Sequence, residues 1–141
     1  MEAADSLQSR VTRLLIADDR GRTRRALRAV LAMQPWIELI GEAADGQEAI
    51  AAVERLRPDV VILDIRMPRL DAIAATTHIK TRWPKIRVIA HSLAEELSAD
   101  ALAAGADAFV PKGAPADELL RALCSHRARH DPGACAATGI Q

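Results

Sequence analysis

The chain has 141 residues, half of them apolar, with 19 basic and 19 acidic residues and a formal net charge of zero. This length and apolar content predict one domain with a proper core and leave no room for a second full domain. Balanced charge gives no electrostatic footprint for nucleic acid or a membrane surface, so we expect function to reside in a local site.

Neither secretion nor membrane insertion is indicated by the sequence. The N-terminal residues lack the basic and apolar regions of a signal peptide, and no apolar run approaches the roughly 18 residues of a membrane span. We therefore expect a cytoplasmic protein with no membrane partner. Two cysteines, Cys124 and Cys135, are too few for a disulfide framework, so we expect both to be free thiols.

In the first part of the chain, strand and helix patterns alternate. The expected elements are a polar lead-in over residues 1–11, a strand over 12–17, a helix over 22–33, an edge or half-exposed strand over 37–43 and a second helix that ends before Pro58. The helices are indicated by apolar residues three and four positions apart, such as Leu27, Val30 and Leu31. The Asp45-Gly46 pair is the turn between the second strand and the second helix.

The central stretch of the chain is Val60-Val61-Ile62-Leu63, an unbroken apolar run that is typical of a strand buried on both faces. After it we expect a third helix from residue 71 or 72 to 83, a strand over 87–90, a short helix ending near Gly105, a strand over 108–110 and a last helix beginning near Pro115. Strands that alternate with helices predict an α/β fold, a parallel sheet with helices on both faces. The expected domain covers residues 12–127, and the aperiodic residues 128–141 are expected to be a disordered tail or linker stub.

Acidic residues follow two of the predicted strands directly. Asp18 and Asp19 come after the first strand, and Asp64 comes after the central one. Parallel strands joined by a helix place their carboxyl ends side by side, at the edge where open α/β sheets bind ligands. Three clustered carboxylates repel one another unless a cation lies among them. Mg²⁺ is the usual occupant where few protein ligands and a phosphate share the site.

With these residues in place, the sequence resembles the receiver domain of bacterial response regulators over about residues 12–127. The motifs that carry the resemblance are Asp18-Asp19, the Asp64-Ile65-Arg66-Met67-Pro68 segment with Asp71 after it, the Ala104-Gly105-Ala106-Asp107 turn, and Lys112 after the last strand. Together these motifs are specific, although any one of them alone would be weak.

The resemblance implies a flavodoxin-like, doubly wound sheet of five parallel strands in the order 2-1-3-4-5. It also implies that Asp64 accepts a phosphoryl group from a histidine kinase or a phosphotransfer protein. Asp18, Asp19, Asp64 and the backbone carbonyl of Arg66 would hold Mg²⁺, and Lys112 would contact the phosphoryl oxygens. Such a chain is a signalling switch that catalyses only its own phosphorylation and dephosphorylation. Its fourth helix, fifth strand and fifth helix would form the face for a downstream protein or a second copy.

Two further residues take roles from the resemblance. Ser92 is the candidate for the hydroxyl residue that ends the fourth strand and binds the phosphoryl group, and Phe109 occupies the aromatic switch position. Packing in the core is the alternative role for Phe109. The sequence departs from the family in three places: the stretch from Ser92 to Gly105 is about two residues shorter than usual, Ala72 replaces a frequent glycine, and Gly113 follows Lys112 where a proline is common.

Outside the acidic site, two groups of residues suggest binding. Arg20, Arg24 and Arg28 are spaced by four along the first helix and are candidates for docking the kinase or phosphotransfer partner. The alternative is a solvated helix face. A second group has the ligand types of a soft metal, but its spacing fits no standard zinc pattern, so a half-buried cysteine with exposed tail residues is the favoured interpretation. This second group consists of Cys124, His126, His130 and Cys135.

Two other function classes compete with a phosphoacceptor. One is a degenerate receiver that binds protein partners without phosphorylation, which retention of three acids and Lys112 argues against. The other is a Mg²⁺-dependent phosphatase of the haloacid dehalogenase type, whose nucleophilic aspartate follows the first strand. That alternative leaves the Asp64 segment unexplained, and the chain is too short for the cap that such enzymes usually carry.

Overall fold

The computed structural model describes residues 11–66 and 72–130. The elements in chain order are β1 (Thr12–Ala17), α2 (Gly21–Leu31), β2 (Ile37–Ala43), α3 (Gly46–Leu56), β3 (Val60–Leu63), α4 (Ala72–Arg82), β4 (Arg87–Ser92), the 3-10 helix η1 (Glu95–Leu97), α5 (Ser98–Ala103), β5 (Ala108–Pro111) and α6 (Ala116–His130). The alternation of strands and helices is therefore as the sequence predicts. Met67, Pro68 and Asp71 of the central motif lie outside the described residues.

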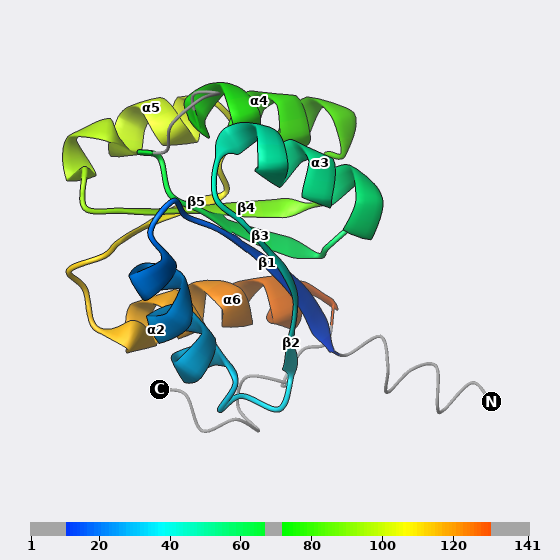
Figure 1. Cartoon of the computed structure of the whole chain (residues 1–141), viewed down its shortest axis with the longest axis vertical. Coiled ribbons are helices and arrows are strands. Elements are labelled where there is room, and N and C mark those ends of the chain that lie inside the picture. Colours follow the sequence, from blue (N-terminus) through cyan, green and yellow to red (C-terminus); the bar gives the residue numbers. More distant parts are fainter. Residues whose placement is uncertain (1–10, 67–71, 131–141) are drawn as a thin grey trace.

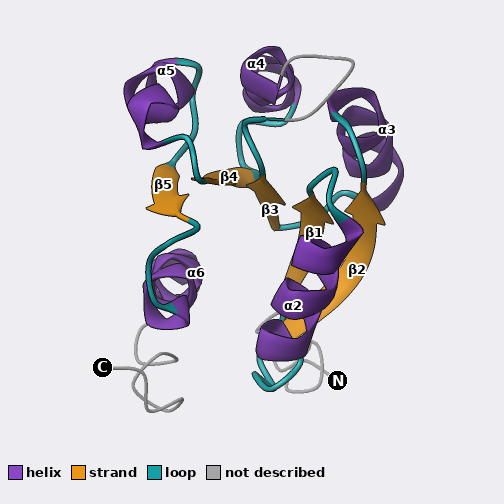
Figure 2. Ribbon diagram, turned by 60° about the vertical axis from the view of Figure 1, so that its left-hand side comes forward, coloured by secondary structure: helices purple, strands orange, loops and turns teal. Residues whose placement is uncertain are grey.

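The five strands form one parallel sheet in the order β2-β1-β3-β4-β5. This confirms the expected doubly wound topology. The helices α3, α4 and α5 cover one face of the sheet, and α2 and α6 cover the other (Figures 1 and 2). Strand β2 lies at an edge, which explains why its sequence mixes glutamates with apolar residues.

The core lies on both faces of the sheet because successive side chains of a strand point to opposite sides. In β1, Leu15 and Ala17 pack under α3 and α4, whereas Leu14 and Ile16 pack against α2 and α6. Every residue of β3 is buried, so the unbroken apolar run needs no polar face.

Local sequence signals set the ends of two elements. Asp45 caps α3: its carboxylate accepts a hydrogen bond from the Glu48 N–H, and Glu48 accepts one from Ala44 N–H in return. Gly105 has a φ of 115° after α5, a backbone conformation that favours glycine, as its expected place at a helix end requires.

Three features differ from the sequence-based expectations. Strand β4 continues two residues beyond 90 and ends at Ser92, because the parallel pairing with β5 extends to that residue. Helix α6 continues to His130, so residues 128–130 are helical where a disordered tail was expected. No glycine or proline interrupts the chain between Pro115 and Pro132, which leaves the backbone free to stay helical. Residues 1–10 and 131–141 lie outside the described residues.

The third difference concerns cysteine. Cys124 is disulfide-bonded, so the expected free thiol at this position is wrong. Cysteine number and compartment do not reveal which thiols meet in space, since tertiary placement decides that. Cys135, the other cysteine of the chain, lies outside the described residues.

The segment between Ser92 and Gly105 is short in structure as well as in sequence. It holds the three-residue η1 and the six-residue α5, where each of the other helices has 11 residues or more. No helix among the described residues is long and apolar enough to span a membrane.

Candidate functional site

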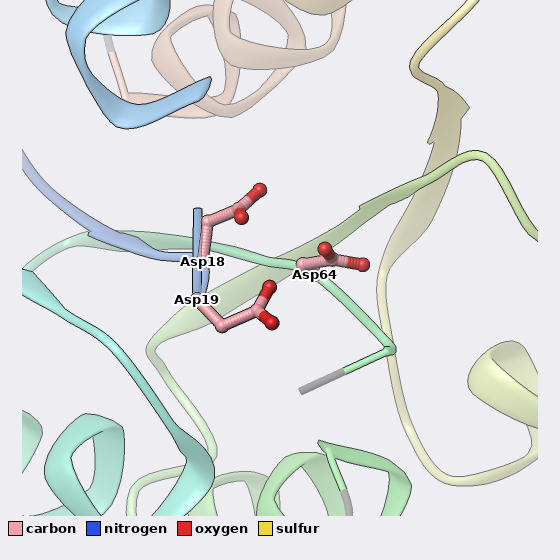
Figure 3. Close-up of side chains that lie close together, drawn as sticks. All are labelled: Asp18, Asp19 and Asp64. Carbon is pink, nitrogen blue, oxygen red and sulfur yellow. The ribbon is translucent and has the colours of Figure 1, made fainter. Parts of the chain in front are cut away.

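Three carboxylates meet at the carboxyl edge of the sheet, where the strand order reverses between β1 and β3. Asp18, Asp19 and Asp64 each offer an oxygen, and these oxygens lie within 4.8 Å of one another (Figure 3). The Asp64 N–H donates to the Ala17 carbonyl at 2.9 Å. This hydrogen bond continues the pairing of β1 with β3 and holds the residues after the two strands side by side. Asp18 and Asp64 are buried, whereas Asp19 is exposed.

Lys112 comes from the end of β5 and completes the cluster. Its Nζ lies 2.6 Å from Asp18 Oδ2 and 2.9 Å from Asp64 Oδ2. Burial lowers the pKa of the Lys112 ammonium, but the hydrogen bonds to Asp18 and Asp64 outweigh burial and raise the pKa above its usual value. The Lys112 ammonium therefore supplies positive charge between two of the three carboxylates. Lysine and acids lie 48 or more residues apart in the chain, so only the fold brings them together.

Both buried carboxylates are held at two oxygens. Asp18 Oδ1 accepts the backbone N–H of Arg20 at 2.9 Å, and Asp64 Oδ1 accepts that of Arg66 at 3.0 Å. The second oxygen of each acid accepts the Lys112 ammonium. Each carboxylate is thus oriented by a backbone N–H of its own loop and by the Lys112 ammonium, which the two carboxylates share.

The oxygen donors fit a hard divalent cation. Mg²⁺ prefers carboxylate and carbonyl oxygens and is bound by one or two carboxylates with substrate phosphates rather than by a closed protein cage. The cluster offers three carboxylates, with Asp19 open to solvent, and no nitrogen or sulfur ligand among the described residues.

The remaining predicted residues take different places. Ser92 is buried at the end of β4, at the same sheet edge, and its Oγ accepts the Ala94 N–H at 3.1 Å. Its carbonyl accepts the Lys112 N–H at 3.0 Å, so the backbone links Ser92 to the lysine. Phe109 is half-buried and packs against the core under α3 to α5, not at the acid cluster.

The arginines of α2 are not a free charged stripe. Arg24 is half-buried; its Nε lies 3.0 Å from Glu42 Oε1 of β2, and its Nη1 donates to the Asp18 carbonyl. Arg28 pairs with the other oxygen of Glu42 at 2.9 Å but stays half exposed. Arg20 is exposed. The stripe therefore divides into Arg24, which braces the acidic loop, Arg28, which is half exposed and paired with Glu42, and Arg20, which is exposed.

Sequence reasoning missed His91. It precedes Ser92 in β4, is 8% exposed, and its Nδ1 has no hydrogen-bond partner among the described residues. Burial, aided by the nearby Lys112 charge and opposed by Asp64, lowers the pKa of His91 to about 4. The signal in the sequence was a histidine directly after the apolar run Val88-Ile89-Ala90.

The soft-metal group of the C-terminal segment is not assembled by the described residues. The Cys124 sulfur is in a disulfide and is therefore not available as a thiolate ligand. The side chains of His126 and His130, and the whole of Cys135, lie outside the described part of the chain.

Comparison with known proteins places the site in a family context. A family model described as the response regulator receiver domain matches residues 14–124. The chain is 42% identical over 103 residues to a protein-glutamate methylesterase/protein-glutamine glutaminase of Alkalilimnicola ehrlichii, covering 71% of this chain and 26% of that protein. It is 32% identical over 112 residues to the transcriptional regulatory protein DegU of Brevibacillus brevis, covering 78% of this chain and 48% of that protein. The chain thus spans less than half the length of these curated relatives.

Solved structures give the same result. The response regulator domain of Thermotoga maritima CheB matches with a TM-score of 0.78 and 35% identity, over 84% of this chain and 97% of that one. CheY in the CheX-CheY-BeF3-Mg complex of Borrelia burgdorferi is among the similar chains, with a TM-score of 0.74, 31% identity and coverage of 81% and 87%. Because sheet order, family model and relatives all agree, this chain belongs to the response regulator receiver domain family of two-component systems.

Proposed function

We propose that this chain is a phosphoacceptor receiver in which Asp64 takes a phosphoryl group from a histidine kinase or a phosphotransfer protein. The observation that supports it best is the convergence of Asp64 with two further acids and with Lys112 at the sheet edge. Methylesterase activity is not part of the proposal, because the similarity to such relatives is confined to about a quarter of their length.

In the proposed reaction, a bond forms between an Asp64 carboxylate oxygen and phosphorus. The bond from phosphorus to the donor's imidazole nitrogen breaks, and that nitrogen keeps the electron pair and is protonated by solvent. Carboxylate and phosphoryl oxygens are both anionic, so the site must offset charge before attack. Asp64 needs no general base, because its carboxylate is already the nucleophile.

Asp18, Asp19, Asp64 and the backbone carbonyl of Arg66 would hold Mg²⁺, which supplies positive charge between the nucleophile and the phosphoryl oxygens. The CheY complex of Borrelia burgdorferi, whose structure contains BeF3 and Mg²⁺, supports this choice of cation. Lys112 already donates to Asp64 Oδ2, so a short movement would let it donate to a phosphoryl oxygen there. Ser92 would bind a further phosphoryl oxygen from the end of β4.

A protein switch requires partners, which we assign to two faces. The kinase or phosphotransfer protein would dock on the α2 side, where Arg20 at the N-cap is exposed, Arg28 is half exposed and Arg24 braces the Asp18 loop. A downstream protein or a second copy would bind the face of α5, β5 and α6, which Ser92 and Phe109 would alter on phosphorylation.

The test is the intact mass of the protein after incubation with Mg²⁺ and acetyl phosphate. We expect the wild type to gain one phosphoryl group, and no gain when EDTA replaces Mg²⁺. Asp64→Asn keeps the side-chain shape without the nucleophile and should gain none, whereas Asp19→Ala should need a higher Mg²⁺ concentration. Asp117→Asn, an exposed acid of α6, is the matched control and should gain phosphate like the wild type.

Two results would contradict the assignment. If Asp64→Asn gains phosphate as readily as the wild type, another residue is the acceptor. If the folded wild type gains none from acetyl phosphate or from any histidine kinase, the chain is a receiver that binds partners without phosphorylation.

A further inference from the structure

The indole ring of Trp83 contacts two guanidinium groups at the edge of the sheet opposite the acidic site. The Arg57 and Arg82 guanidinium carbons each lie 5.2 Å from the centre of the ring, a distance at which a cation and an aromatic face attract each other. Trp83 is half-buried and packs against the core under α3 to α5. Since Arg57 precedes β3 and Trp83 precedes β4, this group lies at the amino edge of the sheet, whereas Asp64 lies at the carboxyl edge.

The exposed cations of the amino edge lack carboxylate partners. Arg57, Arg82 and Lys85 are exposed, and none of the three forms an ion pair within the described part of the chain. Arg57 Nε donates to the Glu54 backbone carbonyl at 3.0 Å, which orients the guanidinium and leaves its two terminal nitrogens without a partner among the described residues. These nitrogens are the two parallel donors that a carboxylate fits.

The acids near this edge do not cancel its charge. Asp107 pairs with Lys80 at 2.9 Å. Asp59 accepts the backbone N–H of Arg13 at 2.8 Å, and the Arg13 guanidinium adds a further cation close by. Glu54 is exposed and forms no ion pair with a described residue. A net positive charge therefore remains at this edge, although the chain as a whole is neutral.

The backbone of Arg57 gives an independent reason to assign its side chain a role. Its φ of 48° and ψ of 64° lie in the left-handed region, and it is the one non-glycine residue of the described chain with a positive φ. Glycine is favoured where a helix ends in this way, because a Cβ is strained there. The carbonyls of Leu56 and Arg57 accept the Arg13 guanidinium, which holds this helix end in place. Strain of this kind is found most often at functional sites.

We propose that the amino edge is a docking surface for an acidic, extended segment of a partner protein, with carboxylates on Arg57 and Arg82 and the rest of the segment against Trp83. The two guanidiniums lie at most about 10 Å apart across the ring. Alternate residues of an extended chain are about 7 Å apart, so acids at alternate positions reach both cations. Tryptophan and arginine are the residue types that most often carry the binding energy of an interface.

The number of cations selects a short protein segment over a polyanion. Nucleic-acid-binding domains carry a basic stripe and a strong excess of positive charge, and binding to an anionic membrane requires about four to eight clustered basic residues. This edge presents three exposed cations around one ring, and the net charge of the chain is zero. The surface is remote from Asp64, so docking does not require phosphorylation and goes beyond the function proposed above.

Fluorescence anisotropy of a fluorescein-labelled peptide of four Glu-Ser repeats, titrated with the full chain, tests this proposal. We expect saturable binding, and the matched Gln-Ser peptide should bind at least roughly tenfold more weakly, because it loses charge-assisted hydrogen bonds. Arg57→Gly should weaken binding of the acidic peptide at least about fivefold while its urea unfolding midpoint stays close to that of the wild type, since relief of backbone strain offsets the lost contact with Trp83. A merely structural arginine would lower the midpoint and leave the affinity unchanged.

Two double variants of equal charge provide a matched pair. Arg57→Gly with Arg82→Ala should abolish peptide binding, whereas Arg22→Ala with Arg25→Ala, two exposed arginines of α2, should bind like the wild type. The proposal is overturned if the wild type does not bind the acidic peptide saturably, if the Gln-Ser peptide binds equally well, or if the α2 pair loses as much affinity as the amino-edge pair. Tighter binding of a ten-nucleotide oligothymidylate would replace the protein segment by nucleic acid. Self-association of the wild type that the amino-edge pair abolishes would replace it by a second copy.

Discussion

A half-buried lysine and a buried histidine at one sheet edge have pKa values that are shifted in opposite directions. Asp18 and Asp64 both accept hydrogen bonds from Lys112 and raise the pKa of its ammonium, although burial alone would lower it. His91 has no such partner among the described residues, and burial beside the lysine lowers its pKa to about 4. The hydrogen bonds to two carboxylates thus outweigh burial at Lys112, whereas burial sets the direction of the pKa shift at His91.

The pKa of His91 predicts a loss of stability in mild acid. The native state resists protonation of His91 while the unfolded chain, with its ordinary pKa of 6.5, accepts it. The stabilisation is therefore complete above pH 6.5 and is lost as the pH falls towards 4. By linkage, the wild type should lose about 2 kcal/mol of unfolding free energy between pH 7.5 and 5 from this residue alone.

The measurement is urea unfolding of the wild type and of His91→Leu at both pH values. Carboxylate titration is common to the two proteins, so their difference isolates the histidine. If His91→Leu loses as much unfolding free energy as the wild type, His91 is not the group that titrates.

At the scale of single elements, helix α2 is anchored through its charged residues rather than through its apolar stripe alone. Arg24 joins β2 to the Asp18 loop, and its partner Glu42 also accepts Arg28. The arginines spaced by four therefore differ in their surroundings: Arg24 contacts Glu42 and the Asp18 loop, whereas Arg28 contacts Glu42 alone and is half exposed. Spacing in the sequence could not separate these roles, because Glu42 belongs to another element.

This division predicts different kinetics for two substitutions in α2. Arg28→Ala should slow phosphorylation by a histidine kinase, most strongly at low salt, and leave acetyl phosphate labelling unchanged, because exposed charges at an interface chiefly govern association. Arg24→Ala should slow both donors and lower the unfolding free energy by about 1–2 kcal/mol, since it removes hydrogen bonds that brace Asp18. The phosphorylation rate of each variant is measured by mass spectrometry, as the decrease of the unphosphorylated protein with time.

Arg55→Ala on α3 is the control, because Arg55 is exposed on the opposite face of the sheet. It should match the wild type with either donor. Docking through α2 is contradicted if Arg28→Ala slows the kinase no more than Arg55→Ala does.

Across the whole molecule, a short hydrogen-bonded route joins the acidic site to β5. Lys112 contacts both acids through its side chain and the Ser92 carbonyl through its backbone, and β4 pairs with β5 up to Ser92 and Pro111. Movement of Lys112 towards a phosphoryl group would therefore pull on the ends of both strands.

We expect the phosphoryl mimic BeF3, added with Mg²⁺, to shift amide signals from Asp64 through residues 92–112. The shifts should include Phe109, which lies one strand residue from the buried Val110. Asp64→Asn, titrated in parallel, should show no such shifts. Shifts limited to residues 18–20, 64–66 and 112 would show that the site does not act on the α5, β5 and α6 face.

The sequence by itself determined the α/β class and identified Asp18, Asp19, Asp64 and Lys112 as candidate site residues. The strand order followed from the family resemblance that these motifs carry. Apolar periodicity and strand-end acids are local patterns, and parallel strands must place their carboxyl ends together. Only the tertiary structure decided that Lys112 offsets Asp18 and Asp64, that Arg24 braces the acidic loop, and that two arginines from different helices meet at the Trp83 ring. Each of these depends on side chains from different elements, whose distance and burial no spacing along the chain encodes.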